Sequence, residues 1–191
     1  MPNAQSLTIV KVGGSLYDLP DLGPRLSAWL ATITGDVILV PGGGPMVETI
    51  RQLDGIHHLG EETCHWLALR TLTLNAHFLA RLLPLASIID DPLRRTGPVC
   101  ILDAHPFALA DEARPGRLPH SWAVTSDSLA LRTAIVAEAG LVLLKSIEAP
   151  ATECGISSDL VDRHFAELLR QAQAGLVVEI VNLRAWARHS G

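Results

Sequence analysis

The chain has 191 residues, a formal net charge of −5, a hydrophobic fraction of 48% and a mean hydropathy of +0.29. This length and composition predict one domain over residues 1–191 with ample core. The acidic balance argues against a nucleic-acid partner, which binds a basic surface. The three cysteines have no metal-like spacing, the N-terminus lacks a signal-peptide pattern, and no apolar run reaches the roughly 20 residues that span a bilayer. We therefore expect a cytoplasmic protein that binds neither membranes nor nucleic acid.

The first apolar run, residues 7–12, carries Lys11 close to its end and is interrupted by Gly13-Gly14. Such a run is typical of a strand buried on both faces of a parallel sheet, where ligands bind beyond the carboxyl ends of the strands. The chain has two lysines, and the second, Lys145, ends a similar run over residues 141–145. Two ammonium groups placed alike on two buried strands suggest one shared anionic ligand.

Strand and helix patterns alternate along the rest of the chain. In order, we expect a helix over 19–33, a strand over 36–40, a helix opening at Pro45, a long helix over 60–83, strands over 85–89 and 99–103, a helix that starts near Thr125 and closes at Gly140, a strand over 141–145, a helix over 159–173, a strand over 176–181 and a short tail helix holding Trp186. We expect residues 105–120 to form one short helix and a flap. The apolar residues of helix 60–83 extend beyond a single stripe of its surface, so this helix should pack on two sides. The pattern predicts an α/β fold, a three-layer αβα sandwich with a mainly parallel sheet and a short C-terminal part.

Two glycine-rich junctions are candidates for binding phosphate. At Gly13-Gly14-Ser15 the backbone N–H groups can approach an anion beside Lys11, although a tight turn with a solvated lysine explains the same residues. At Gly42-Gly43-Gly44 three glycines precede a helix, whose N-terminus offers unpaired donors and a positive dipole end. A flexible turn is the alternative here.

Two further segments carry charge. Thr125-Ser126-Asp127-Ser128 has the composition of a helix N-cap, and the Asp127 carboxylate is also suited to hold a lysine ammonium. Lys145 either snorkels at its strand end or joins that site. Arg70, near His65 and Trp66 on the long helix, is a candidate contact to an acceptor, with a surface or inter-subunit pair as the alternative. His57, His58 and His65 match no metal motif, so we expect no protein-bound metal.

The order of these segments, K-x-G-G-S, P-G-G-G-P, T-S-D-S-L and L-L-K, resembles the amino acid kinase superfamily over about residues 7–145. The resemblance implies an ATP- and Mg²⁺-dependent kinase that phosphorylates a phosphate or carboxylate oxygen. It places Lys11, Gly13 and Gly14, with Ser15 and Ser126, at the phosphoryl and nucleotide groups, Gly42, Gly43 and Gly44 at the acceptor, and Asp127 between the lysines. PGGGP, HWLALR (65–70) and SW-x-x-TSDS-L are most similar to the small kinases of methanofuran-type cofactor synthesis, which phosphorylate [5-(aminomethyl)furan-3-yl]methyl phosphate.

The sequence also departs from the superfamily. Larger members follow the second lysine strand with an Asp-Gly-Val-Tyr-like stretch and a later catalytic lysine, whereas this chain has SIEAP over 146–150 and no lysine after Lys145. Either Lys145 takes over the role of the later lysine, or that role is lost. A non-catalytic storage or regulatory subunit is therefore the alternative function. A dinucleotide-dependent oxidoreductase lacks its G-x-G-x-x-G motif here. The apolar long helix and the high mean hydropathy predict a homodimer or larger homo-oligomer.

Overall fold

The structure, a computed structural model, describes residues 6–148, 160–172 and 176–186. Its centre is a six-stranded sheet in the order β3-β4-β2-β1-β5-β6, in which every pairing is parallel. The strands are β1 (Leu7–Val12), β2 (Asp36–Pro41), β3 (Ser87–Ile89), β4 (Val99–Leu102), β5 (Gly140–Lys145) and β6 (Val178–Asn182). The two runs that carry the lysines, β1 and β5, are neighbours, and Val12 pairs with Leu144. Both lysines therefore lie near the same carboxyl edge of the sheet.

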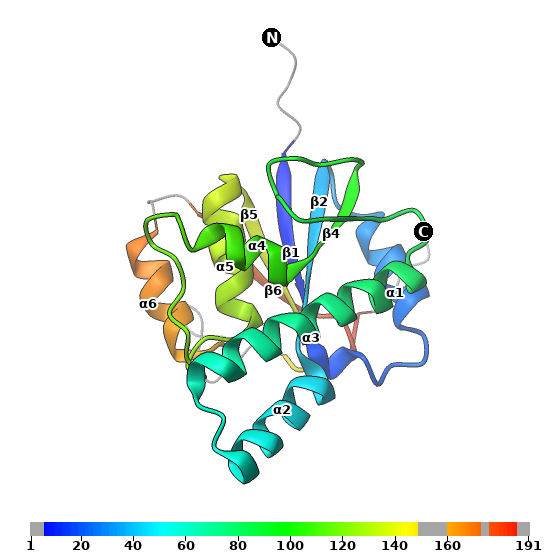
Figure 1. Ribbon diagram of the computed structural model, residues 1–191. Coiled ribbons are helices and arrows are strands. Elements are labelled where there is room, and N and C mark those ends of the chain that lie inside the picture. Colours follow the sequence, from blue (N-terminus) through cyan, green and yellow to red (C-terminus); the bar gives the residue numbers. More distant parts are fainter. Residues whose placement is uncertain (1–5, 149–159, 173–175, 187–191) are drawn as a thin grey trace.

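Helices cover both faces of this sheet (Figure 1). They are α1 (Leu22–Leu30), α2 (Gly44–His57), α3 (Glu61–Leu82), α4 (Ala104–Asp111), α5 (Ser126–Ala137) and α6 (Arg163–Gln171), with a short 3₁₀ turn, η1 (Gly14–Leu16), directly after β1. Alternate strand residues belong to two different core clusters: Ile9 and Leu143 lie in one, and Val10 and Leu144 in the other. This alternation is the period of two of a strand covered on both faces. The predicted αβα sandwich with a parallel sheet is confirmed.

The long helix α3 contacts both clusters, as its apolar pattern predicts. Leu69 and Leu72 pack in the cluster that includes α4 and α5, and Ala76 and Leu79 pack in the cluster that includes α1. Within the part of the chain described, no helix combines the length and the apolar character that a membrane crossing needs.

Several predicted boundaries differ from the observed ones. α5 ends at Ala137 because Glu138 adopts the left-handed conformation, with φ of 51°, and Gly140 already belongs to β5, so the predicted closure at Gly140 is wrong. The segment 105–120 contains the short helix α4 and then a loop. α6 begins only at Arg163, since Asp162 caps it. A turn follows β6 up to Trp186 in place of the start of a tail helix; later residues lie outside the described ranges, as do 149 and 150 of the SIEAP stretch.

At the carboxyl edge of the sheet, each of its two central strands continues into a helical element. β1 runs into η1 and β2 runs into α2, so α2 and the start of α3 lie beyond this edge (Figure 1). The four sequence segments singled out above therefore converge at one end of the molecule.

Candidate active site

A cavity of about 320 Å³ opens beyond the carboxyl ends of β1 and β5. Its polar end is lined by residues of the glycine-rich segments and by the two lysines. Its other walls come from α3, α4 and the loop that joins α4 to α5. The residues at the polar end are Lys11, Gly13, Gly14, Ser15, Gly43, Gly44, Thr125, Ser126 and Lys145. The other walls include His65, Leu69, Leu72, Phe107, Glu112, Leu118 and Trp122.

Asp127 lies between the two lysines and contacts both. Its Oδ1 is 2.9 Å from Lys11 Nζ, and its Oδ2 accepts a hydrogen bond of 2.6 Å from Lys145 Nζ. Lys11 follows Ile9 by two residues, and Lys145 follows Leu143 by two, so strand alternation puts both ammoniums on the sheet face that α5 covers. The start of α5 delivers the carboxylate to the same point.

This cluster is deeply buried, because Lys11 is 6% exposed and Asp127 5% exposed. Burial by itself would raise the pKa of Asp127, but the charges of Lys11 and Lys145 outweigh it and hold that pKa below its usual value. Burial, followed by the charge of Lys11, lowers the pKa of Lys145. Two cations share one anion, so the cluster attracts a further negative charge from the cavity.

The two glycine loops touch each other backbone to backbone. A Cβ added to Gly14 would lie 2.2 Å from the backbone nitrogen of Gly44, and one added to Gly42 would lie 2.4 Å from that of Gly14. Gly44 itself has a φ of +59°, a conformation that other residues rarely adopt. The glycines are thus required by the close approach of η1 and the α2 N-terminus. α2 begins with Gly43 as its N-cap and without a side-chain cap hydrogen bond, so its first N–H groups remain available to an anion.

One buried side chain, Asn75, and one half-buried side chain, Tyr17, hold the second loop in place. Asn75 Nδ2 donates to the carbonyls of Gly42 and Gly43, at 2.7 and 3.0 Å, and the Tyr17 hydroxyl donates to Gly42 at 3.0 Å. Burial raises the pKa of Tyr17, which keeps the phenol protonated as a donor. Neither residue is among those that the sequence predicts for the site. Asn75 carried a signal, because it is the one side-chain amide in the apolar helix 60–83.

Most of the predicted site residues meet here, but not all of them face the cavity. Asp127 and Gly42 lie behind its wall, where one contacts the lysines and the other supports the glycine loop. The N–H of Gly13 donates to the Leu144 carbonyl at 2.9 Å and so is not offered to an anion. Its lack of a side chain matters instead, because a Cβ would lie 2.7 Å from that same oxygen. Ser15 lies at the cavity and shares a 2.8 Å hydrogen bond with Ser146.

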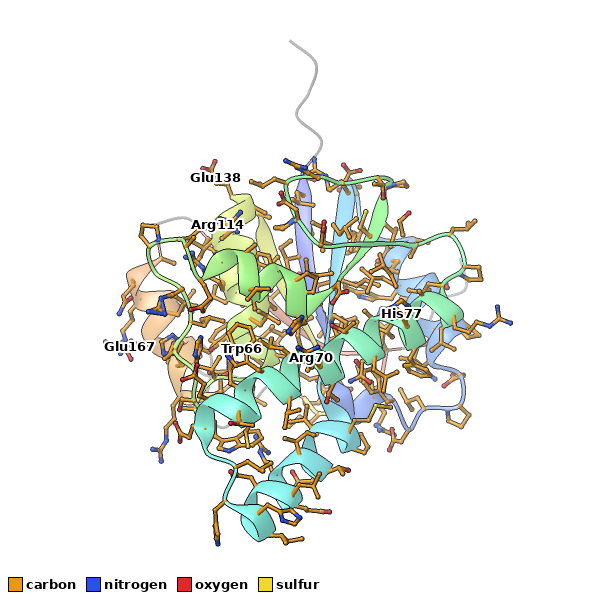
Figure 2. The ribbon with its side chains drawn as sticks, viewed as in Figure 1. Trp66, Arg70, His77, Arg114, Glu138 and Glu167 are labelled. Carbon is orange, nitrogen blue, oxygen red and sulfur yellow. The ribbon has the colours of Figure 1, made fainter. Side chains whose placement is uncertain are left out.

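The structure separates Arg70 from this site. Arg70 is exposed on α3 and is not among the residues that line the cavity (Figure 2). His65, Leu69 and Leu72 form the helix stripe that faces the cavity. Arg70 directly follows Leu69 and is rotated from it by about 100°, away from Ala68, which also lines the cavity, since 3.6 residues make one turn. Arg70 therefore lies outside the lining of this cavity, and its expected contact with an acceptor is not supported by this geometry.

Comparison with known proteins gives one relative and a set of solved structures. The chain is 29% identical over 128 residues to [5-(aminomethyl)furan-3-yl]methyl phosphate kinase of Methanocaldococcus jannaschii, a match that covers 64% of this chain and 57% of the relative. The chain thus matches less than two thirds of that protein's length. No protein-family model matches the chain.

Two of the solved structures that the chain resembles are uridylate kinases. The UMP kinase of Ureaplasma parvum superposes with a TM-score of 0.60 at 14% identity, covering 93% of this chain and 90% of that one. The uridylate kinase of Archaeoglobus fulgidus gives 0.55 at 16% identity, covering 80% and 69%. The fold is therefore that of these two uridylate kinases, and the predicted resemblance is confirmed at the level of the fold. The relative found by sequence, from Methanocaldococcus jannaschii, is an aminomethylfuran phosphate kinase.

The contact between the glycine loops makes a prediction for stability. We expect Gly14→Ala to destabilise the fold by about 1–3 kcal/mol or more, because the new methyl group meets the backbone of Gly44. Gly55→Ala on α2 is the matched control: nothing lies within 4 Å of its added Cβ, and alanine gains about 0.5–1 kcal/mol over glycine inside a helix. Chemical denaturation of both variants measures the difference, and equal stability would contradict the interlocked loops.

Proposed function

We propose that this protein is a kinase that transfers the γ-phosphoryl group of ATP to a phosphate oxygen of [5-(aminomethyl)furan-3-yl]methyl phosphate, in methanofuran-type cofactor synthesis. The observation that carries the proposal is the pair of lysines held by Asp127 at the edge of a glycine-lined cavity. The name of the relative from Methanocaldococcus jannaschii supports the acceptor, and the fold of the uridylate kinases supports the reaction class.

The residues of the chain supply position and charge. Phosphoryl transfer passes through a loose transition state in which charge spreads over the equatorial oxygens. Lys11 and Lys145 put two ammoniums where this charge develops, and their low exposure strengthens the interaction. Asp127 keeps both ammoniums in place without itself lining the cavity. No side chain need act as a strong base, because the acceptor oxygen is already anionic.

The candidate site suits a nucleoside triphosphate that binds together with the metal ion held by its own phosphates. Gly13, Gly14, Gly43 and Gly44 line the polar end of the cavity without side chains, and the start of α2 offers N–H donors. In the described part of the chain no three His, Cys, Asp or Glu side chains are grouped as a metal site. Mg²⁺ is commonly held by substrate phosphates and one or two carboxylates. When bound, ATP·Mg²⁺ supplies the γ-phosphoryl group and neutralises part of its charge.

The outer walls of the cavity suit the proposed acceptor. Leu69, Leu72, Phe107 and Leu118 give an apolar surface for a furan ring, and two carboxylates follow on α4 and at its end. Asp111 is occupied by the buried Arg132, which donates two hydrogen bonds of 2.8 and 2.9 Å. Glu112 is more exposed, and its partners Arg117 and His120, at 3.1 and 2.9 Å, lie nearer the surface than Arg132. Glu112 is the carboxylate that we assign to the aminomethyl group.

The catalytic assignment is tested by turnover of the furan phosphate with ATP·Mg²⁺. We expect Lys11→Ala and Lys145→Ala each to lower kcat on the order of 10²–10³-fold, by analogy with the loss of one preorganised donor. Arg70→Ala, at an exposed position outside the cavity, should keep the wild-type rate. Wild-type turnover in both lysine variants would refute their role. No turnover and no calorimetric heat with ATP for the unmodified protein would favour the storage or regulatory alternative.

The acceptor assignment predicts an effect that depends on the amine. Glu112→Gln should raise KM for the aminomethyl acceptor about tenfold, because it removes a charge-assisted hydrogen bond worth about 1.5 kcal/mol. An analogue with methyl in place of aminomethyl should show no such change. Glu62→Gln is the matched control, since Glu62 also contacts His120 but does not line the cavity. An equal rise for both acceptors would remove Glu112 from amine recognition.

We further propose a homodimer or larger homo-oligomer that covers α2 and the outer side of α3. None of the α2 residues is buried, and Leu53 and Ile56 are 40% and 68% exposed. On α3, Leu74 and Phe78 are also exposed, at 56% and 36%. Exposed apolar area of this kind marks interaction sites.

Light scattering tests the assembly. The unmodified protein should have at least twice the 20.5 kDa of one chain, and Ile56→Glu should lower that mass by putting a charge into the interface. Leu85→Glu, at a position that is 96% exposed in the turn between α3 and β3, is the control. A wild-type monomer would end this proposal.

A further inference from the structure

The carboxylate of Asp162 joins the starts of two helices. Asp162 is the N-cap of α6, where its Oδ1 accepts from the N–H of Phe165 at 2.9 Å. Its Oδ2 accepts from the N–H and hydroxyl of Thr125, at 3.0 and 2.7 Å, and from the N–H of Ser128 at 3.1 Å. The Ser128 hydroxyl donates to Oδ1 as well. One side chain therefore accepts five hydrogen bonds, far more than capping α6 requires.

Four of these five bonds end on the residues that flank Asp127. Thr125 precedes Asp127 by two positions, and its hydroxyl oxygen accepts from the N–H of Asp127 at 3.2 Å as the N-cap of α5. Ser128 follows Asp127 directly. The backbone of Asp127 is thus held from both sides by groups that Asp162 anchors. Because this backbone orients the Asp127 carboxylate toward the two lysines, Asp162 acts on the lysine cluster indirectly, through Thr125 and Ser128.

The same segment also touches Lys145 directly. Lys145 Nζ donates to the carbonyl of Leu160 at 2.7 Å, in addition to its bond to Asp127. Leu160 lies two residues before Asp162, so the bonds of Asp162 also limit where this carbonyl can lie. Both described hydrogen-bond partners of the Lys145 ammonium, one from α5 and one from the chain before α6, depend on the same carboxylate.

We propose that Asp162 is a positioning residue for phosphoryl transfer, which holds Asp127 through Thr125 and Ser128 and holds Lys145 through Leu160. The role builds on the proposed kinase function but concerns the geometry of the lysines, which can be measured without turnover. A residue that only caps α6 would stabilise that helix and leave the ammonium groups where they are.

The test compares Asp162→Asn with a variant that weakens α6 by another route. An amide cannot accept at both ends, so Asp162→Asn must leave N–H groups of α5 or α6 unpaired. Leu168→Ala is the matched control, because Leu168 is a buried α6 residue that packs in the core without contacting this network. Ser128→Ala, which removes one hydroxyl donor, is the milder variant should Asp162→Asn fail to fold.

Two readouts separate positioning from stability. With only two lysines in the chain, ¹⁵N-lysine labelling gives two side-chain ammonium signals by NMR. We expect Asp162→Asn, and more weakly Ser128→Ala, to shift or broaden the Lys145 signal, while Leu168→Ala leaves it unchanged. Well below the lowest melting temperature, kcat should fall roughly 10- to 100-fold in Asp162→Asn with KM nearly constant, since a misplacement of about 1 Å costs about 10²-fold.

The outcomes are distinct. If Asp162→Asn leaves the lysine signals as they are in Leu168→Ala, or if the two variants lose kcat in equal measure, Asp162 is a helix cap and the proposal fails. If Asp162→Asn moves the Lys145 signal while the unmodified protein turns over no phosphorylated acceptor, the positioning stands and the kinase function fails.

Discussion

The geometry of the candidate active site depends on one buried carboxylate, that of Asp127, which contacts the ammonium groups of both Lys11 and Lys145. Removing an ion from water is costly, and partners that are close and well aligned offset that cost. Asp127 meets this condition only because three elements converge: β1 and β5 lie side by side and α5 starts directly over their ends. An error in the register of either strand by one residue would turn its lysine to the opposite face. The register of the central sheet is therefore also the geometry of the site.

A second constraint is the absence of side chains where the two loops meet. The backbone of Gly14 contacts that of Gly44, and Asn75 and Tyr17 hold the carbonyls on the far side. Helix α3 thus serves the site twice, with Asn75 behind the loop and the stripe from His65 to Leu72 along the cavity. A helix that packs against both core clusters is well suited to hold a loop in place, because any rotation of the helix would disturb the packing of both cores.

The superfamily resemblance and the local geometry support the proposed function in different ways. The likeness to the uridylate kinases shows the fold, and fold alone does not define a reaction. The specific support for the proposed function comes from the two lysines, the Asp127 carboxylate and the glycines that line the cavity. Since no lysine follows Lys145 in the sequence, Lys11 and Lys145 are the only two lysine ammoniums that the chain has for the phosphoryl group. The hydrogen bond from Lys145 to the Leu160 carbonyl ties the C-terminal part of the chain to that task.

The sequence by itself determined the parallel sheet, the two lysine strands and the glycine junctions, because these depend on local patterns: continuous apolar runs, strand alternation and residues without a Cβ. The order of the motifs was sufficient to identify the superfamily resemblance. Only the tertiary structure decided that Asp127 lies behind the cavity wall, that Asn75 and Asp162 hydrogen-bond to the glycine loop and to the start of α5, and that Arg70 lies outside the cavity lining. Each of these depends on the rotation of a helix about its axis or on a contact between segments far apart in the chain, and neither is encoded in local spacing.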